Sequence, residues 1–351
     1  MTDASNKINK KRTKRIVRIV LFLGTAISLY FVPWLLVWAW LWPLPNSMQG
    51  QAKEAIGYGF SGVVVYVDQK GKPPGFYTAG WHDPAKKIPA KAGAYFKIGS
   101  IGKLYKAVAI AKLVSDGRLD LDKTLADYLP GLAGRIENAG KITLKMLAQH
   151  RSGIPNYTDT PDYWAHPKET ADERLGLILD QPARFAPGEK YEYGNTNYLL
   201  LNKIMDKVLG YNNFQYIREE ILAPLNLHHT FASIKDVDIG EVMSGYHQGH
   251  EGDLKTDDIG MIATAEDVGI FIRALNTGTL LTGKEREIYS SIYKYQHSGW
   301  VPGYQAFAGY DGAADTVMVT FYGTTDPDLI FWNLAEIING RFAKIWERNA
   351  G

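Results

Sequence analysis

The sequence predicts an α/β domain of the α+β type, in which helices flank an antiparallel sheet, and one transmembrane helix before it. Three observations lead to this prediction. Runs rich in β-branched and aromatic residues occur early and late in residues 50–351, helical patterns fill most of residues 120–285, and residues 19–44 carry no charge. Strands at both ends of a domain with helices between them indicate an antiparallel sheet that both ends complete. We therefore expect an all-helical subdomain inserted over about residues 120–285.

The N-terminal segment predicts a membrane anchor. Residues 19–44 would form a helix of about 39 Å, which exceeds the roughly 30 Å hydrocarbon core of a bilayer. Residues 1–18 hold seven Lys and Arg, so this tail should stay cytoplasmic and the rest of a single-pass protein should lie outside the cell membrane. Four tryptophans near the distal end suit the membrane interface: Trp34, Trp38, Trp40 and Trp42. A cleaved signal peptide ending near residues 50–52 is the alternative, although its apolar region would normally span only about 7–15 residues.

Local patterns predict the elements of residues 50–351. Two β-rich runs at 62–68 and 75–80, separated by a Lys, Gly and Pro turn, predict a hairpin. Apolar residues at helical spacing after Ser100 predict a helix that stops near Gly117. The remaining expected elements are strands at 297–300, 305–310 and 316–322 and a closing helix at 329–346.

Three short motifs occur in order and suggest chemistry. They are Ser100-Ile-Gly-Lys103, Tyr193-Gly-Asn195 and His297-Ser-Gly299. The first two patterns also occur by chance elsewhere in the chain, at Ser291-Ile-Tyr-Lys294 and at Tyr211-Asn-Asn213. Only Ser100 stands between an extended segment and the start of a long helical pattern, so the first tetrad has the structural context that the chemistry needs.

A serine and a lysine three residues apart on a helix can form a nucleophile and its base. Residues i and i+3 share a face, with Cβ atoms about 5–6 Å apart, so Nζ of Lys103 can reach Oγ of Ser100. A serine hydroxyl needs an adjacent acceptor, such as a desolvated lysine, before it can attack a carbonyl. Tyr193 is the expected third group for proton exchange, and Asn195 should project the same way on one extended segment.

The motifs and the phrases around them resemble the serine β-lactamase and penicillin-binding-protein superfamily. Within it they are similar to the class C-like branch of D-alanyl-D-alanine carboxypeptidases, β-lactamases and esterases. The matching phrases are Phe96–Lys103, Ile142–Pro155, Tyr193–Tyr198, Ile262–Asp267 and His297–Gly303. The resemblance spans about residues 52–350 and implies a β-lactamase/transpeptidase-like fold.

The resemblance also implies a role for each motif residue. Ser100 would be acylated, Lys103 would activate it, and Tyr193 would relay the proton to the leaving group, with the primary base left open between Lys103 and Tyr193. Asn195 would bind a substrate amide or acyl side chain. The third motif would be an edge strand whose residues Ser298, Gly299 and Trp300 bind the substrate, with Ser298 on a carboxylate. Backbone N–H groups of Ser100 and Trp300 would form the oxyanion hole. No metal or cofactor is implied.

His297 divides the possible functions. A histidine is only partly charged near neutral pH, so it would hold an anionic β-lactam or C-terminal carboxylate more weakly than the lysine that is usual in class C β-lactamases. We therefore expect a serine hydrolase acting on D-alanyl peptides or D-alanyl esters of the cell envelope. The alternatives are a β-lactamase and a penicillin-binding or sensing module without turnover. Substrate choice should depend on the loops at 156–171 and 235–258.

Other patterns point away from competing functions. Removing residues 1–18 changes the net charge from +2 to −4, and no basic stripe for nucleic acid remains. The sequence has no cysteine. Gly57-Tyr-Gly-Phe-Ser-Gly62 precedes a strand instead of joining a strand to a helix, which argues against a dinucleotide site. The pairs His228-His229 and His247/His250 lack a third ligand for a metal. For His150, at the end of a helical segment, a structural role is expected.

Overall fold

The computed structural model describes the backbone of residues 2–350 and the side chains of residues 13–349. The chain forms two compact units, with the boundary between Pro43 and Leu44. The larger unit carries all the candidate site residues.

The N-terminal unit holds two helices instead of the single helix expected over residues 19–44. Helix α1 spans Thr2–Tyr30 and α2 spans Trp34–Leu41. The prediction of one continuous helix is wrong because Pro33 has no N–H to donate and its ring clashes with the preceding turn. Among the described residues, no single helix has the length and apolar character to cross a membrane; Thr13–Tyr30 and Trp34–Leu41 meet both criteria only as a pair, bent by 79°.

The predicted antiparallel sheet is confirmed, and both ends of the larger unit build it. Its six strands follow the order β3-β2-β1-β10-β9-β8, with every neighbouring pair antiparallel. The strand bounds are β1 Gly62–Gln69, β2 Gly75–Asp83, β3 Ile88–Pro89, β8 His297–Val301, β9 Tyr304–Asp311 and β10 Thr316–Tyr322. Because β8 is at the edge of the sheet, one of its sides is left for other groups to approach.

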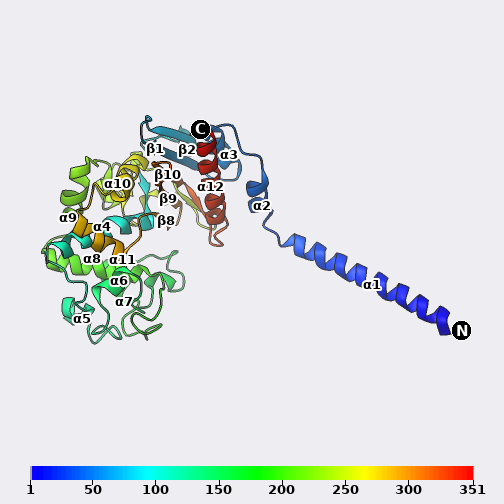
Figure 1. Ribbon diagram of the computed structural model, residues 1–351, viewed down its shortest axis with the longest axis horizontal. Helices are drawn as coiled ribbons and strands as arrows, with labels where there is room; N and C mark the ends of the chain where they lie inside the picture. The colour runs from blue at the N-terminus through cyan, green and yellow to red at the C-terminus, as the bar shows by residue number, and fades with distance from the viewer. Residues whose placement is uncertain (1, 351) are drawn as a thin grey trace. The chain divides into compact units, whose positions relative to one another are not determined.

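Helices cover both faces of the sheet (Figure 1). Helix α10 (Ala265–Thr277) packs against β1, β9 and β10, and α3 (Met48–Gly57) and α12 (Ile330–Ala350) pack on the sheet as well. Strand β1 lies between the layers, which explains its continuous apolar run: Val64 and Tyr66 join the core that includes α10, while the alternate valines face the other way.

A mainly helical half lies at the other end of the larger unit (Figure 1). Its helices are α4 Gly102–Ser115, α5 Leu125–Tyr128, α6 Leu144–Ala148, α7 Ala171–Gly176, α8 Asn195–Leu209, α9 Asn213–Ile217 and α11 Gly283–Ile292. Short 3₁₀ turns are η1 Gly99–Ile101, η2 Pro130–Leu132, η3 Tyr157–Asp159, η5 Ala223–Leu225, η6 Ile234–Asp236, η7 Ile239–Glu241 and η8 Leu254–Thr256, and a π-helical turn, η4, spans Arg218–Leu222.

The sequence suggested an all-helical insertion over residues 120–285, and this prediction is wrong because the insertion also contains short strands. Strands β5 (Thr230–Phe231) and β7 (Ile262–Ala263) pair in a small sheet with β4 (Phe96–Lys97), and β6 (Tyr246–His247) pairs with β11 (Thr324–Thr325). These strands have two residues each, too few to produce a period-two pattern in the sequence. The small sheet matters because β4 leads directly to Ser100.

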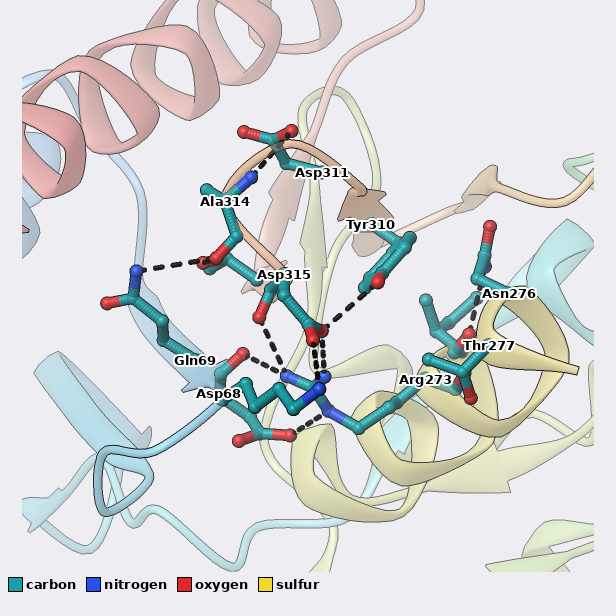
Figure 2. A network of polar contacts seen from close by, with 12 residues as sticks. Asp68, Gln69, Arg273, Asn276, Thr277, Tyr310, Asp311, Ala314 and Asp315 are labelled. Carbon is teal, nitrogen blue, oxygen red and sulfur yellow. Dashed lines mark hydrogen bonds and ion pairs between the residues drawn. The ribbon is translucent and has the colours of Figure 1, made fainter. Parts of the chain in front are cut away.

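Arg273 ties α10 to two strands of the main sheet (Figure 2). Its guanidinium bonds both the side chain and the carbonyl of Asp68 at the end of β1, with 2.7 Å to the carbonyl. It also donates to Oδ1 of Asp315, in the β9–β10 turn, at 2.5 Å, and Tyr310 donates to the same carboxylate at 3.0 Å. This half-buried network fixes the helix against the end of the sheet where β1 ends and β10 begins.

Candidate active site

Ser100 lies where β4 turns into α4, as its sequence context predicted. The turn η1 contains Gly99 at φ +52°, a conformation that favours glycine. A Cβ added to Gly99 would lie 2.9 Å from the backbone N of Trp300, and one added to Gly299 would lie 2.0 Å from the carbonyl O of Ile98. Two glycines therefore let edge strand β8 approach the turn that carries Ser100.

Three side chains meet at the Ser100 hydroxyl. Nζ of Lys103 lies 2.9 Å from Oγ of Ser100, and the hydroxyl of Tyr193 donates to the same Oγ at 2.6 Å. Nζ of Lys103 also donates to Oδ1 of Asn195 at 2.7 Å. The structure thus brings together residues from the first two motifs, which are about ninety positions apart in the chain.

Asn195 is held by the start of a helix and not by the extended segment that we expected. Gly194 is extended, but Asn195 is the first residue of α8. Its backbone N–H donates to Oδ1 of Asn156 at 2.9 Å, and its Nδ2 donates to the hydroxyl of Thr158 at 3.2 Å. The amide oxygen of Asn195 is thereby turned toward Lys103.

His150 supports the Tyr193 loop from behind. Its Nδ1 accepts the backbone N–H of Gly194 at 3.3 Å, and its ring lies 4.5 Å from the ring of Tyr193. Burial lowers the pKa of His150 to about 3. A neutral, buried histidine that orients the loop agrees with the structural role expected for it. Its contact with Tyr193 was not visible in the sequence, because 43 residues separate them.

Burial sets the protonation of the lysine and the tyrosine. The pKa of Lys103 is held well below its usual range by burial and, to a smaller extent, by the charges of Lys106 and Lys294. Burial raises the pKa of Tyr193 to about 12, although its hydrogen bond to Ser100 acts in the opposite direction. Near neutral pH, this environment favours a neutral amine on Lys103 and a protonated hydroxyl on Tyr193.

His297 is placed differently from our expectation of a partly charged group. Its Nδ1–H donates to the carbonyl of Ser298 at 2.5 Å, and its Nε2 accepts the hydroxyl of Tyr293 at 2.9 Å. Burial and the charge of Lys294 lower the pKa of His297 to about 3. The prediction that His297 is partly charged near neutral pH is therefore wrong, because burial in this site lowers its pKa far below the ordinary imidazole value. His297 contributes a neutral ring to the site wall.

A cleft of about 960 Å³ opens over Ser100. Ser298 and Trp300 of β8 line one side, and the loop at 156–171 contributes Tyr157, Tyr163 and Trp164. The Trp164 and Trp300 rings lie 5.4 Å apart at an interplanar angle of 82°. The loop at 235–258 lines the cleft through Lys235 and residues 256–258. Both expected loops thus take part, and the aromatic character of the first is a feature that the motifs did not predict.

The backbone amides of Ser100 and Trp300 are near neighbours across the η1–β8 contact. The Cβ position of Gly99 is 2.9 Å from N of Trp300, and that of Gly299 is 3.3 Å from N of Ser100. Two N–H donors this close, at the start of a helix, suit a carbonyl oxygen that gains negative charge during attack by Ser100.

The family model for β-lactamase matches residues 48–294, more than two thirds of the chain and the whole first two motifs. The chain belongs to the β-lactamase family. It is therefore a member of a family of serine hydrolases, as the sequence resemblance indicated.

Individual curated relatives match less than half of this chain. Protein flp of Staphylococcus aureus (strain MW2) is 31% identical over 152 residues, 43% of this chain and 30% of that protein. A protein of Escherichia coli (strain K12) named "Putative D-alanyl-D-alanine carboxypeptidase" is 32% identical over 151 residues, 41% of this chain and 35% of that protein. The matched region thus spans about a third of the length of these curated relatives.

The fold is that of solved structures in the same group. The crystal structure of D-amino acid amidase from Ochrobactrum anthropi SV3 with L-phenylalanine superposes with a TM-score of 0.77, over 87% of this chain and 99% of that chain, at 21% identity. At this identity the likeness establishes the fold alone.

The duplicate motifs do not assemble a second site of this kind. The hydroxyl of Ser291 donates to the carbonyl of Ile288 within α11 at 2.7 Å, and Asn212 caps the start of α9. Among the residues whose side chains are described, no group of three or more acidic or histidine side chains is placed to hold a metal ion.

Proposed function

We propose that this protein is a membrane-anchored serine hydrolase that forms an acyl-enzyme on Ser100 with D-alanyl peptides or D-alanyl esters of the cell envelope. One observation carries the proposal: the Ser100 hydroxyl contacts both the amine of Lys103 and the hydroxyl of Tyr193. A serine placed between two groups of opposite proton preference can be deprotonated as it attacks a carbonyl.

The pKa directions favour Lys103 as the primary base. Its neutral amine accepts the Ser100 proton while Oγ forms a bond to the substrate carbonyl carbon, and the backbone N–H groups of Ser100 and Trp300 stabilise the oxyanion. Tyr193, still protonated, then donates to the leaving nitrogen or oxygen as its bond to carbon breaks. Its phenolate recovers the proton that Lys103 took from Ser100, because the Lys103 amine lies only 5.0 Å from the centre of the Tyr193 ring.

Hydrolysis of the acyl-enzyme reverses these roles. A water molecule in the position of the departed group loses a proton to the Lys103–Tyr193 pair, and its oxygen attacks the ester carbon. The Oγ–carbon bond breaks and Ser100 regains its proton. The free acid leaves, and every proton taken in the first half is returned in the second.

The third motif supports a substrate without a C-terminal carboxylate. A neutral, buried His297 offers no cation beside Ser298. D-Alanyl esters are therefore supported more strongly than D-alanyl-D-alanine peptides. The name of the Escherichia coli relative points to D-alanyl chemistry as well.

The test is a substrate panel against the full-length protein. It should contain D-Ala-D-Ala peptides, D-alanyl esters, short-chain p-nitrophenyl esters and β-lactams, with L-alanyl esters as stereochemical controls. We expect turnover of D-alanyl esters, weaker turnover of D-Ala-D-Ala peptides and little hydrolysis of β-lactams. The intact mass of the protein, measured in the same reactions, separates turnover from trapping. Preferred hydrolysis of β-lactams would favour a β-lactamase, and a stable adduct without turnover would favour a sensing module.

The location at the cell membrane is part of the proposal. It is supported by the apolar, tryptophan-rich residues 19–44 after a basic tail, and by the bent pair of helices. Full-length protein should fractionate with membranes and be degraded by protease added outside the cell, while a chain lacking residues 1–43 should be soluble and should still acylate Ser100. Recovery of the native protein in the medium, with a new N-terminus near Lys53, would point to a cleaved signal instead.

A further inference from the structure

We propose that the cleft continues from Ser100 along the groove between α4 and α8 into a second subsite, formed by Lys106, Asn202 and Arg174, which binds a carboxylate on the acyl part of the substrate. The inference rests on the proposed function, because it names the substrate class of that same site. It would make this protein select acyl groups that carry an acid.

The two helices present their residues to the cleft at helical spacing. Lys106 follows Lys103 by three positions on α4, and both line the cleft. On α8, Leu199 and Asn202 follow Asn195 by four and seven positions, and all three line the cleft as well. Residues at these spacings share one face of a helix. The groove between the helices is therefore continuous with the site around Ser100.

The subsite has an excess of positive charge. Lys106 and Arg174 are both half-buried, and neither forms an ion pair with a described carboxylate. Arg174 donates through Nε to the carbonyl of Lys168 at 2.8 Å and through Nη2 to the carbonyl of Glu169 at 2.9 Å, which fixes its guanidinium without neutralising it. Two cations at one end of a cleft are best stabilised by an anion that enters it.

The carboxylates nearby are engaged elsewhere or lie at the rim. Asp206, whose charge acts on Lys106, accepts the backbone N–H of Asn213 at 2.6 Å and its Nδ2 at 2.7 Å. Glu169 lines the cleft with an exposed side chain. Burial and the charge of Arg174 lower the pKa of Lys106 to about 8, so this amine still carries a proton at neutral pH. The positive charge thus remains available to a ligand.

Asn202 gives a second, independent indication of a ligand. Its Oδ1 is buried and has no hydrogen-bond partner among the described residues. A buried amide oxygen without a partner costs free energy, which a bound polar group can recover. Asn202 also lines the cleft, so rotation of its side chain toward the open space can bring the NH₂ group to a carboxylate there. Lys106 and Asn202 would then bind the acid from the two walls of the groove.

The spacing along α4 sets the length of the acyl group. At 1.5 Å per residue, six positions place Lys106 about 9 Å from Ser100 along the helix. A succinyl group on the nitrogen of a D-alanyl residue puts its free carboxylate at roughly this distance from the carbonyl that Ser100 attacks. N-Succinyl-D-alanine p-nitroanilide is therefore a suitable test ligand, and N-succinamoyl-D-alanine p-nitroanilide is the matched ligand with an amide in place of the acid.

Binding to the full-length protein with Ser100→Ala tests the subsite without catalysis. We expect the acid to bind about tenfold or more tightly than the amide, because it makes charge-assisted hydrogen bonds. Adding Lys106→Met should remove this preference, whereas adding Lys141→Met, which removes an exposed charge outside the cleft, should preserve it. Lys106→Gln provides a second neutral variant if the Met variant folds poorly. Calorimetry measures the affinity of each protein for both ligands.

Two results would overturn the subsite: equal affinity of the Ser100→Ala protein for the acid and the amide, or a preference that survives both Lys106 substitutions. Failure of the proposed hydrolase activity is a separate result, seen as absence of turnover and of Ser100 adducts in the protein without substitutions. The binding experiment does not depend on that chemistry, so each proposal can fail alone.

Discussion

Lys103 is a buried lysine whose amine has no carboxylate partner among the described residues. Its amine contacts the neutral groups of Ser100 and Asn195, and two other lysines add to the cost of charging it. A buried lysine that faced a carboxylate would stay charged as an ion pair and could not accept a proton. The neutral surroundings of Lys103 are therefore what make it suitable as a base, and the tyrosine beside it stays protonated for the opposite task.

Lys103→Ala and Tyr193→Phe should each lower the rate of Ser100 acylation by about 10²–10⁴-fold. Because both side chains act on the same Oγ, the double variant should be little slower than the slower single variant. The measurement is the acylation rate of the four proteins with one activated ester. Tyr191→Phe, the same change at an exposed neighbouring tyrosine, is the control and should keep the parent rate. Losses that multiply in the double variant would mean that the two residues do not form one proton-transfer unit.

Among the elements, α10 and β1 meet with almost no space between them. A Cβ added to Gly269 of α10 would lie 2.3 Å from Cε1 of Tyr66, whose side chain is fully buried. By contrast, a Cβ added to Gly340 of α12 would have no atom within 4 Å, and Gly340 is exposed. Gly269 is therefore needed for close packing of the helix against the strand, whereas no contact in the described fold requires a glycine at position 340.

Gly269→Ala should destabilise the protein by about 1–3 kcal/mol, because Tyr66 or the helix must move. The matched change Gly340→Ala should stabilise it by about 0.5–1 kcal/mol, since alanine loses less backbone entropy in a helix. Urea unfolding of the chain lacking residues 1–43 gives both values. Equal effects of the two substitutions would show that the contact between α10 and β1 is looser than described.

Regular elements could be predicted from the sequence where they are long enough to repeat a pattern. The helix after Ser100, the late strands and the closing helix are found as α4, β8–β10 and α12. The helix expected over residues 19–44 fails at Pro33, where a local rule overrides an apolar run. Asn195 starts α8 because Asn156, far away in sequence, accepts its N–H, and no local pattern reports such a contact.

At the scale of the whole molecule, burial determines the protonation states of the site residues, which the sequence alone does not predict. The motifs predicted which residues meet around Ser100, because order and context carry that information. They gave the wrong charge for His297, since the ordinary imidazole pKa applies only where water reaches the ring. The support from His150 and the groove beyond Lys106 depend on how α4, α8 and the loops pack together, and that packing is not encoded at any fixed spacing.

The two buried histidines make stability depend on pH. Folding lowers the pKa of His150 and of His297 to about 3, whereas an unfolded histidine titrates near 6.5. Below about pH 6.5 the unfolded chain binds more protons, so the free energy of unfolding falls as the pH falls. Between about pH 5.5 and 4.5 the loss should approach roughly 1.4 kcal/mol per pH unit for each histidine.

Urea unfolding at about pH 7.5, 5.5 and 4.5 measures this loss. His150→Gln and His297→Gln should each make the dependence on pH shallower, while His228→Gln, at an exposed position, should leave it unchanged. A slope that is the same in all four proteins would show that the two rings accept protons in the folded state.

Covalent labelling tests the central claim most directly, because the proposed hydrolase mechanism requires Ser100 to be the nucleophile. Full-length protein is treated with a fluorophosphonate or penicillin probe, and its intact mass is measured beside the Ser100→Ala and Ser291→Ala variants. Ser291 belongs to the duplicate tetrad, and its hydroxyl is bonded within α11. We predict one adduct on the parent and on Ser291→Ala, and none on Ser100→Ala. Equal labelling of the parent and Ser100→Ala would contradict the account.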